Sequence, residues 1–211
     1  MSETRTMTTP LGDARLVSHR SRHPIATLLL SHGAGGGIEA QDLQALAKHL
    51  PGQGISVHLL EQPWRVAGRK LAGAPATLDT GLRAVVDQIR PRTPLIVGGR
   101  SAGARSAARC ARDLGASACL ALAFPLHPPG HPEKTRVGEL RNTRVATLVV
   151  QGERDPFGRP EEFPSGTEMA VIPAADHAFK VPKSGPLSQA EALSVLVEAV
   201  LEWTVREVGR D

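Results

Sequence analysis

Six short apolar runs, separated by stretches of helical periodicity, most strongly limit how this 211-residue chain can fold. They span residues 26–31, 55–60, 94–99, 118–124, 146–151 and 167–172. Short segments that are apolar throughout are typical of parallel strands covered on both faces. The intervening stretches repeat apolar residues at helical spacing, as in Leu78, Leu82, Val85, Val86 and Ile89. This alternation predicts an α/β fold built on a doubly wound, mostly parallel sheet.

The start of the chain and the segment lengths refine this prediction. Residues 3–9 and 13–18 flank the turn Pro10-Leu11-Gly12, which predicts an antiparallel hairpin at one edge of the sheet. No shift of composition and no internal repeat divides the chain, so residues 1–211 are expected to form one domain. The stretch between the fourth and fifth apolar runs is too short for a helical cap domain. We therefore expect any site at the ends of the strands to be open.

Composition and charge exclude several classes of partner. The formal net charge of +4 comes mainly from scattered arginines, and aromatic residues make up 3% of the chain. A nucleic-acid partner is not expected, because the chain has neither a basic cluster nor an aromatic platform. No apolar run is long enough to span a bilayer, and the first residues lack the apolar core of a secretion signal. We expect a cytoplasmic monomer or homodimer, away from membranes, with Cys110 and Cys119 as buried free thiols.

A sharp turn between a strand and a helix is predicted at Gly99-Arg100-Ser101-Ala102-Gly103. This segment has the G-x-S-x-G pattern of a nucleophile elbow, directly after one apolar run and directly before an Ala-rich stretch. The flanking glycines let the backbone turn tightly enough to present the Ser101 hydroxyl. A serine hydroxyl is a weak nucleophile until a base takes its proton, so the pattern requires a base elsewhere in the chain.

Three other segments place polar residues at the ends of predicted strands. The first apolar run opens into the glycine-rich loop His32-Gly33-Ala34-Gly35-Gly36-Gly37, whose backbone amides can point at one spot. Asp155 follows the fifth run, and His177 follows the sixth. The order loop, Ser, Asp, His is that of α/β-hydrolase triads and differs from the chymotrypsin and subtilisin orders.

These positions predict acyl transfer to water. Ser101 would attack a carbonyl carbon while His177 accepts its proton, and an acid would hold the imidazole in the useful tautomer. Asp155 is the expected acid. Glu153, which lies nearer its strand, and Asp176, which is adjacent to the histidine, are rivals for this role.

Backbone amides supply the predicted oxyanion hole. The N–H of Ala102 is the first in the helix after Ser101 and so lacks an intrahelical acceptor. A second N–H would come from Ala34 or Gly35 in the glycine-rich loop. Losing one such donor typically raises the barrier by about 2.7 to 4 kcal/mol. His32 is expected to fix this loop structurally and to take no part in the chemistry.

A histidine pair in the stretch before the fifth run raises the question of a metal. His127 and His131 have a spacing that would align two ligands on one face of a helix. Prolines at positions 128, 129 and 132 forbid a helix there. No metal site is therefore expected, and the loop is expected to shape the substrate pocket.

Two other classes of function fit parts of the chain. A loose dinucleotide-binding pattern follows a predicted strand, with an acidic residue at the end of the next strand, at Gly35, Gly37, Ala40 and Glu61. A nicotinamide-binding protein, however, has no need for residues in the Ser, Asp, His order. The second alternative is a catalytically silent scaffold, since a fold does not guarantee activity.

Five segments of the chain resemble one family of compact α/β-hydrolases: SHGAGGG, GGRSAGAR, LAFPLHPPGHPEKTR, VVQGERDPFG and ADHAFK. That family includes testis-expressed protein 30, the hydrolase-like domain of non-specific-lethal complex subunit 3 and bacterial dienelactone-hydrolase-like proteins. The resemblance implies a lidless α/β-hydrolase fold with Ser101, Asp155 and His177 as the triad. Its elbow reads more like GRSMGGR, and here Ala102 and Ala104 stand in place of Met and Gly. Both changes bear on pocket shape and not on the chemistry.

The residues and the resemblance together predict a serine hydrolase that cleaves a small ester through an acyl-enzyme, without cofactor or metal. Arg100 and Arg105 flank the nucleophile and could attract an anionic substrate. Substrate contacts are expected from Arg100, His127, Pro128, Phe157 and Phe179. An open site favours short acyl chains, because a methylene contributes about 0.8 kcal/mol only when it leaves water.

Overall fold

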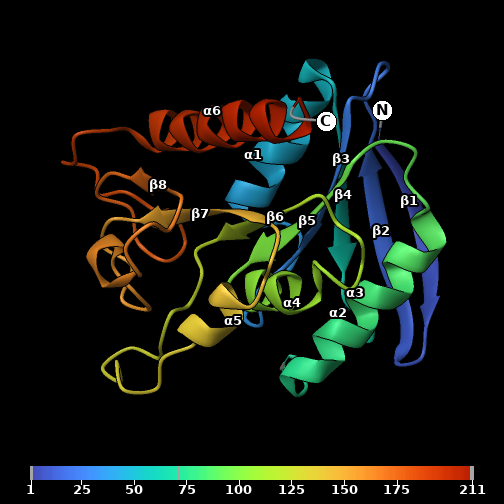
Figure 1. The fold of residues 1–211 in the computed structure, drawn as a ribbon, viewed down its shortest axis with the longest axis horizontal. Helices are drawn as coiled ribbons and strands as arrows, with labels where there is room; N and C mark the ends of the chain where they lie inside the picture. The colour runs from blue at the N-terminus through green and yellow to red at the C-terminus, as the bar shows by residue number, and fades with distance from the viewer. Residues whose placement is uncertain (1, 71, 210–211) are drawn as a thin grey trace.

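The computed structural model describes residues 2–70 and 72–209, and within them eight strands form one sheet in the order β1-β2-β4-β3-β5-β6-β7-β8 (Figure 1). Six neighbouring strands, β4, β3, β5, β6, β7 and β8, run parallel. The strands are β1 (Ser2–Thr9), β2 (Gly12–His19), β3 (Ala26–Ser31), β4 (Ile55–Glu61), β5 (Leu95–Arg100), β6 (Ala118–Leu122), β7 (Ala146–Gly152) and β8 (Met169–Ile172). The predicted α/β-hydrolase fold with a mostly parallel sheet is confirmed.

Helices cover both faces of the sheet (Figure 1). Helices α1 (Gln41–His49) and α6 (Gln189–Val208) lie on one face, and α3 (Pro75–Ile89), α4 (Ala102–Cys110) and α5 (Val137–Arg141) lie on the other. The remaining short elements are α2 (Pro63–Val66), η1 (Leu50–Gln53) and η2 (Pro160–Glu162).

Strand β3 shows how the buried strands serve both layers. Leu28 and Leu30 belong to the core cluster that includes residues of α1 and α6, whereas Leu29 belongs to the cluster that includes residues of α3 and α4. All three side chains have zero exposure. Successive side chains of a strand point to opposite faces, so a strand covered on both faces must be apolar throughout.

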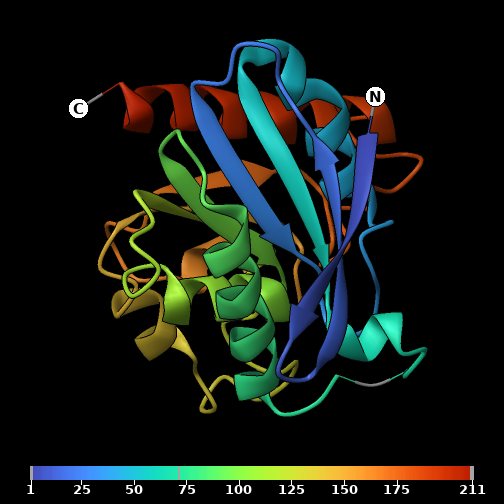
Figure 2. The ribbon, with the colours of Figure 1, turned by 90° about the vertical axis from the view of Figure 1, so that its right-hand side faces the viewer.

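The predicted antiparallel hairpin at the sheet edge is also present (Figure 2). Strands β1 and β2 pair from Ser2 opposite His19 to Thr9 opposite Gly12, and β2 is antiparallel to β4. Gly12 adopts a φ of 102°, a conformation open to glycine, and the Thr9 hydroxyl donates to its carbonyl oxygen at 2.6 Å.

Two strand boundaries differ from the sequence prediction by two residues, for identifiable reasons, and the others by at most one. The run predicted at 118–124 ends as a strand at Leu122, because Ala123 adopts a φ of 45° and turns the chain. The run predicted at 167–172 begins as a strand only at Met169. Thr167 belongs instead to a turn, where both its backbone N–H and its hydroxyl donate to the Pro164 carbonyl oxygen.

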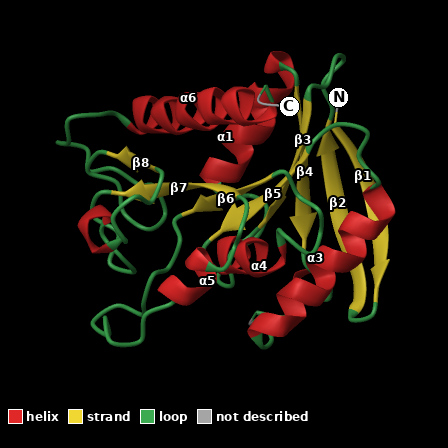
Figure 3. Cartoon of the chain, viewed as in Figure 1, coloured by secondary structure: helices red, strands yellow, loops and turns green. Residues whose placement is uncertain are grey.

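Residues 123–145, all of them described, contain only the five-residue helix α5 besides loops, so no cap domain is inserted there (Figure 3). Cys110 and Cys119 are free and buried, and burial raises their thiol pKa values to about 11 and about 12. No helix in the described part of the chain combines the length and the apolar character needed to cross a bilayer.

Candidate active site

Ser101 stands in a strained turn between β5 and α4. Its backbone φ is 53° and ψ is −114°, outside the regions that non-glycine residues favour. A Cβ at Gly99 would lie 2.5 Å from the Ser31 carbonyl oxygen, and a Cβ at Gly103 would collide with the carbonyl oxygens of Ser31 and His32. The two glycines of the motif are therefore required by the close approach of β3 and the loop that follows it. Strain of this kind persists only where the surrounding structure holds it.

The structure brings the three predicted residues into one chain of contacts. His177 Nε2 lies 3.0 Å from Ser101 Oγ, and His177 Nδ1 lies 2.7 Å from Asp155 Oδ2. The Asp155 side chain has zero exposure, whereas the His177 side chain is 18% exposed. With Nδ1–H donating to the carboxylate, Nε2 is free to accept the serine proton.

The Asp155 carboxylate is held from two further directions. The Phe157 N–H donates to Oδ1 at 2.8 Å, and the Gln151 side-chain amide donates to Oδ2 at 2.9 Å. Gln151 is fully buried at the end of β7 and also donates to the Gly158 carbonyl oxygen at 2.8 Å. No sequence motif marks Gln151, and its one sequence signal is a polar side chain at the end of an apolar strand.

The rival acids make other contacts. Glu153 accepts a hydrogen bond from the Ala174 N–H, and Asp176 accepts from the Ala178 and Lys180 N–H groups. Both side chains are exposed; Asp176 closes a turn of its own segment, whereas Glu153 joins the end of β7 to the segment after β8. Of the three carboxylates that the sequence offered, Asp155 is the one hydrogen-bonded to the His177 ring.

His32 anchors the glycine-rich loop beside the serine. Its Nδ1–H donates to the Gly33 carbonyl oxygen at 2.8 Å, and its Nε2 accepts from the Gln62 N–H at 3.1 Å. Burial lowers the pKa of His32, which favours this neutral form. A Cβ at Gly33 would lie 3.2 Å from the Ser101 Cβ, so the loop passes directly over the nucleophile.

The residues predicted to donate backbone amides to an oxyanion hole lie in this loop and at the start of α4. Ala34 and Gly35 follow Gly33 and are exposed, and Ala102 is the first residue of α4. The N–H groups of a helix's first turn lack intrahelical acceptors and favour negative charge nearby. The assignment of these amides to an oxyanion hole stays a prediction.

One wall of the site is formed by the loops after β6 and β7. The Phe157 ring stacks on the His177 ring with centroids 4.2 Å apart and planes at 30°. The His127 N–H donates to the Phe157 carbonyl oxygen at 3.0 Å, which joins the Pro-rich loop to this wall. Pro128, the next residue, is half-buried.

The two histidines of the Pro-rich loop each face a carboxylate of their own. His127 Nε2 lies 3.1 Å from Glu162 Oε1, and His131 Nδ1 lies 3.1 Å from Glu133 Oε1. Among residues 2–70 and 72–209, no three His, Cys, Asp or Glu side chains gather in a way that could hold a metal ion.

Two of the residues expected to contact substrate have side chains engaged inside the protein. Phe179 adopts a φ of 53°, and its side chain is fully buried in the core with the residues of α6, so we no longer expect it to touch a substrate. The Arg100 side chain is 15% exposed and donates to the His177 carbonyl oxygen at 2.8 Å. Its guanidinium is therefore directed at the backbone of the histidine segment.

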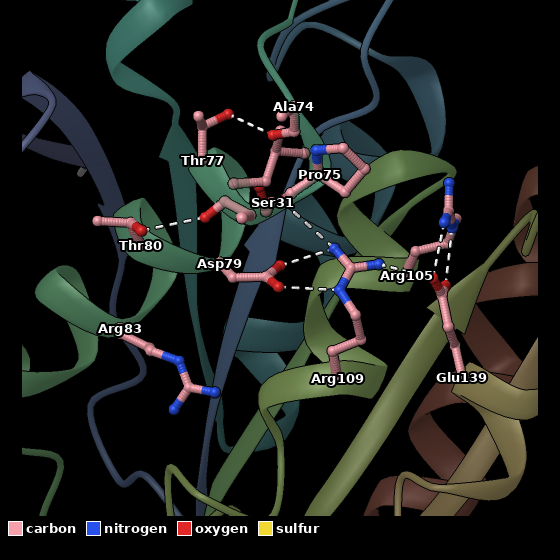
Figure 4. A network of polar contacts seen from close by, with 12 residues as sticks. Ser31, Ala74, Pro75, Thr77, Asp79, Thr80, Arg83, Arg105, Arg109 and Glu139 are labelled. Carbon is pink, nitrogen blue, oxygen red and sulfur yellow. Dashed lines mark hydrogen bonds and ion pairs between the residues drawn. The ribbon is translucent and has the colours of Figure 1, made fainter.

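Arg105, the second arginine beside the nucleophile, is also occupied. Its guanidinium makes a bidentate pair with Glu139 of α5, at 2.7 and 2.6 Å (Figure 4). The acidic residue of the dinucleotide pattern is likewise engaged, because buried Glu61 forms an ion pair with Arg15 of β2.

The chain belongs to the alpha/beta hydrolase domain family, whose model matches residues 24–205. Similar solved structures include XC6422 from Xanthomonas campestris, described as an α/β serine hydrolase without lid (19% identity, 96% of this chain and 94% of that chain, TM-score 0.71). A dienelactone hydrolase from Anabaena variabilis covers 98% of this chain and 97% of its own, at 17% identity and a TM-score of 0.75. Est1E from Butyrivibrio proteoclasticus has 15% identity, covers 98% and 99%, and has a TM-score of 0.76.

A curated relative is similar over a small part of its length. Chondramide synthase from Chondromyces crocatus is 31% identical over 198 residues, which is 86% of this chain and 5% of that protein. The chain thus spans about one twentieth of the relative that it matches. The solved structures, at this level of identity, show that the fold is shared.

Proposed function

We propose that this chain is a serine hydrolase that cleaves small esters or related acyl substrates through an acyl-enzyme. The observation that carries the proposal is the unbroken series of contacts from Ser101 Oγ through the His177 ring to the buried Asp155 carboxylate, at 3.0 and 2.7 Å. Within the family, we propose that the chain belongs to the compact branch that its motifs resemble.

The geometry supports a reaction in two halves. In the first, Ser101 Oγ attacks the substrate carbonyl carbon while His177 Nε2 takes the hydroxyl proton. His177 then gives this proton to the departing alcohol, and the acyl group stays on Ser101. In the second, water attacks the acyl carbon, His177 takes a water proton, and the acid leaves as the proton returns to Ser101.

Charge that develops on the substrate oxygen would be met by backbone amides. Ala102 N–H at the start of α4 and the N–H of Ala34 or Gly35 in the glycine-rich loop are the proposed donors. Asp155 balances the imidazolium that forms on His177, and because it is fully buried it does so in a setting of low dielectric.

An open site argues for small substrates. The Pro-rich loop is tied at its base, where the Arg136 N–H donates to the Leu126 carbonyl oxygen at 2.7 Å and the Arg136 guanidinium donates to the Pro125 carbonyl oxygen at 2.9 Å. Such a loop can wall one side of a site but cannot cover it. Acetyl to butyryl esters are therefore expected to be cleaved faster than decanoyl esters, with no activation at a lipid interface.

The test is turnover of a 4-nitrophenyl ester series, with a matched thioester, by the wild-type chain and by Ser101→Ala, His177→Ala and the double variant. Each single variant should lose several orders of magnitude, and the double variant little more, because the residues act as a unit. Ser106→Ala, a change at a buried serine of α4, is the control and should keep the wild-type rate.

Two results would contradict the proposal. Turnover by a folded Ser101→Ala variant at the wild-type rate would exclude this nucleophile. Absence of turnover by the wild-type chain across the whole series would instead favour the catalytically silent scaffold.

A further inference from the structure

Three successive carbonyl groups that begin at His177 are each bound by a side chain from a different element. Arg100 at the end of β5 donates to the His177 carbonyl oxygen at 2.8 Å. Gln41 of α1 donates to that of Ala178 at 2.7 Å, and Gln189 of α6 donates to that of Phe179 at 2.8 Å. The histidine segment is therefore held along its backbone by three side chains, of which only Arg100 stands in the nucleophile motif.

This segment needs external support because its backbone is strained. Ala174 and Phe179, on either side of His177, have φ values of 56° and 53°, where non-glycine residues are uncommon. Strain of this kind is unfavourable and persists where surrounding contacts fix it.

The Arg100 guanidinium itself lies beside a buried carboxylate. Its Nε lies 3.5 Å from Asp42 Oδ1, and the Asp42 side chain has zero exposure in the first turn of α1. Burial raises the pKa of Asp42, an effect that the charge of Arg100 opposes. The two groups are thus mutually dependent, since a charge on either would be costly to bury without the other.

Arg100 also touches the other half of the site. It directly precedes Ser101 in the chain, and a Cβ at Gly33 would lie 3.4 Å from its Nη1. A single guanidinium therefore lies against the glycine-rich loop, the start of α1 and the histidine segment. With these contacts made inside the protein, it is poorly placed to bind a substrate anion.

We propose that Arg100, held by Asp42, is a positioning residue that fixes the His177 backbone so that the imidazole stays in line between Asp155 and Ser101. This proposal rests on the proposed serine hydrolase function. Displacement of a catalytic group by about 1 Å can cost about a hundredfold in rate. The expected defect is therefore in kcat, with substrate binding little changed.

The first test compares Arg100→Met with the wild-type chain on a neutral acetyl ester and on an ester that carries a carboxylate. Arg100→Met should lower kcat by about 10- to 100-fold on both esters and leave both KM values within about twofold. If KM rises for the anionic ester alone, Arg100 binds substrate and the proposal is wrong. Arg83→Met is the matched control, because Arg83 lies in α3 and forms a solvent-exposed ion pair with Asp113, with side chains 41% and 63% exposed.

Two further variants keep the test valid if Arg100→Met folds poorly. Arg100→Lys retains the charge opposite Asp42 but loses the planar fork, so it should fold and still lose kcat. Sub-denaturing guanidinium should partly restore the rate of Arg100→Ala and leave that of Ser101→Ala unchanged. A rate for Arg100→Lys equal to that of wild type, or an Arg100→Ala rate that guanidinium does not raise, would overturn the positioning role.

Asp42→Asn tests the second half of the pair. It should lower kcat in the same direction as Arg100→Met, and the double variant should be no slower than Arg100→Met alone, because Asp42 acts through the arginine. Independent, multiplying losses would contradict this link. Failure of the underlying function is distinguishable, since it would appear as ester turnover that survives Ser101→Ala or as no turnover by the wild-type chain.

Discussion

The two sides of Ser101 both contain arginine–carboxylate pairs, yet these pairs are built differently. On the side of His177, Arg100 meets a single carboxylate, Asp42, at 3.5 Å, and that carboxylate is fully buried. Another nitrogen of the guanidinium, Nη2, donates to the His177 carbonyl oxygen at 2.8 Å.

On the other side, α4 carries two arginines that join three helices (Figure 4). Arg109 makes a bidentate pair with Asp79 of α3, at 2.8 and 2.7 Å, and lies 3.1 Å from Glu139 of α5. Arg105 is bidentate to the same Glu139. These side chains are each about one fifth exposed, so water reaches the network.

The difference shows that residue type alone does not assign a role. The partly buried network of Arg105 and Arg109 has well-formed ion pairs and connects helices, so it contributes to stability. The buried pair has poorer geometry and touches the segment that carries the base, so it contributes to alignment. Variants of the helix network should therefore change mainly the free energy of unfolding, and variants of the buried pair mainly kcat.

The largest effect is expected from a methyl group added at Gly103, where the nucleophile turn meets the end of β3. Gly103→Ala would place its Cβ against the carbonyl oxygens of Ser31 and His32, which belong to backbone and cannot move aside cheaply. We expect a loss of about 3 kcal/mol in the free energy of unfolding, together with loss of ester turnover. Urea denaturation and the 4-nitrophenyl acetate assay measure the two losses.

The same substitution in α5, the helix that carries Glu139 of the arginine network, provides the control. Gly138 lies in α5 with open space around the position of a Cβ, and its φ is not positive. Gly138→Ala should stabilise the protein by about 0.5–1 kcal/mol, because alanine favours helix, and should leave turnover unchanged. Equal destabilisation by both variants would contradict the contrast between the two sides.

An intermediate effect is expected from the helix network. Arg109→Met removes the bidentate pair with Asp79 and one contact of Glu139, which should lower the free energy of unfolding by about 1 to 2 kcal/mol after allowance for solvent. The exposed pair at Arg83 should contribute less than about 0.5 kcal/mol by the same measurement. A fall in kcat for Arg109→Met beyond twofold would show that this network also positions the site.

The smallest effect is a difference in acid sensitivity. Burial lowers the pKa of His32, so its contribution to stability is complete above the ordinary histidine pKa of 6.5 and is lost as pH falls through the lowered value. Burial alone would raise the pKa of Glu139, but Arg105 and Arg109 outweigh it and lower that pKa, so the helix network holds below the ordinary value of 4.5. Acid should therefore loosen the side of the site first.

Trp64 can report this order, because its ring lies edge-on to that of His32 with centroids 5.2 Å apart. In a Trp203→Phe background, Trp64 fluorescence should titrate with a midpoint below pH 6.5. His32→Asn, which keeps a donor for the Gly33 carbonyl, should abolish the titration. A transition that persists in His32→Asn would assign the change to another group.

Much of the fold could be predicted because strand burial and helix periodicity act locally. The order Ser101, Asp155, His177 was readable for the same reason, since each residue follows an apolar strand. The direction of Phe179 was not, because it depends on a positive φ that no local pattern indicates.

The supporting residues were also beyond reach of the sequence. Gln41, Asp42, Gln151 and Gln189 belong to no motif. Two of them, Gln41 and Asp42, act on residues that are distant in the sequence, Ala178 and Arg100. Asp42 resembles an ordinary acidic residue in the first turn of an amphipathic helix. Only the folded structure brings it to its partner, Arg100 at the end of β5.

The most direct measurement of the central claim is covalent labelling with a fluorophosphonate, followed by mass spectrometry of the modified peptide. The account predicts one phosphonyl group on Ser101 of the folded chain, labelling that slows by orders of magnitude in His177→Ala, and none in Ser101→Ala. A folded wild-type chain that stays unlabelled, or that is labelled at another serine, would contradict it.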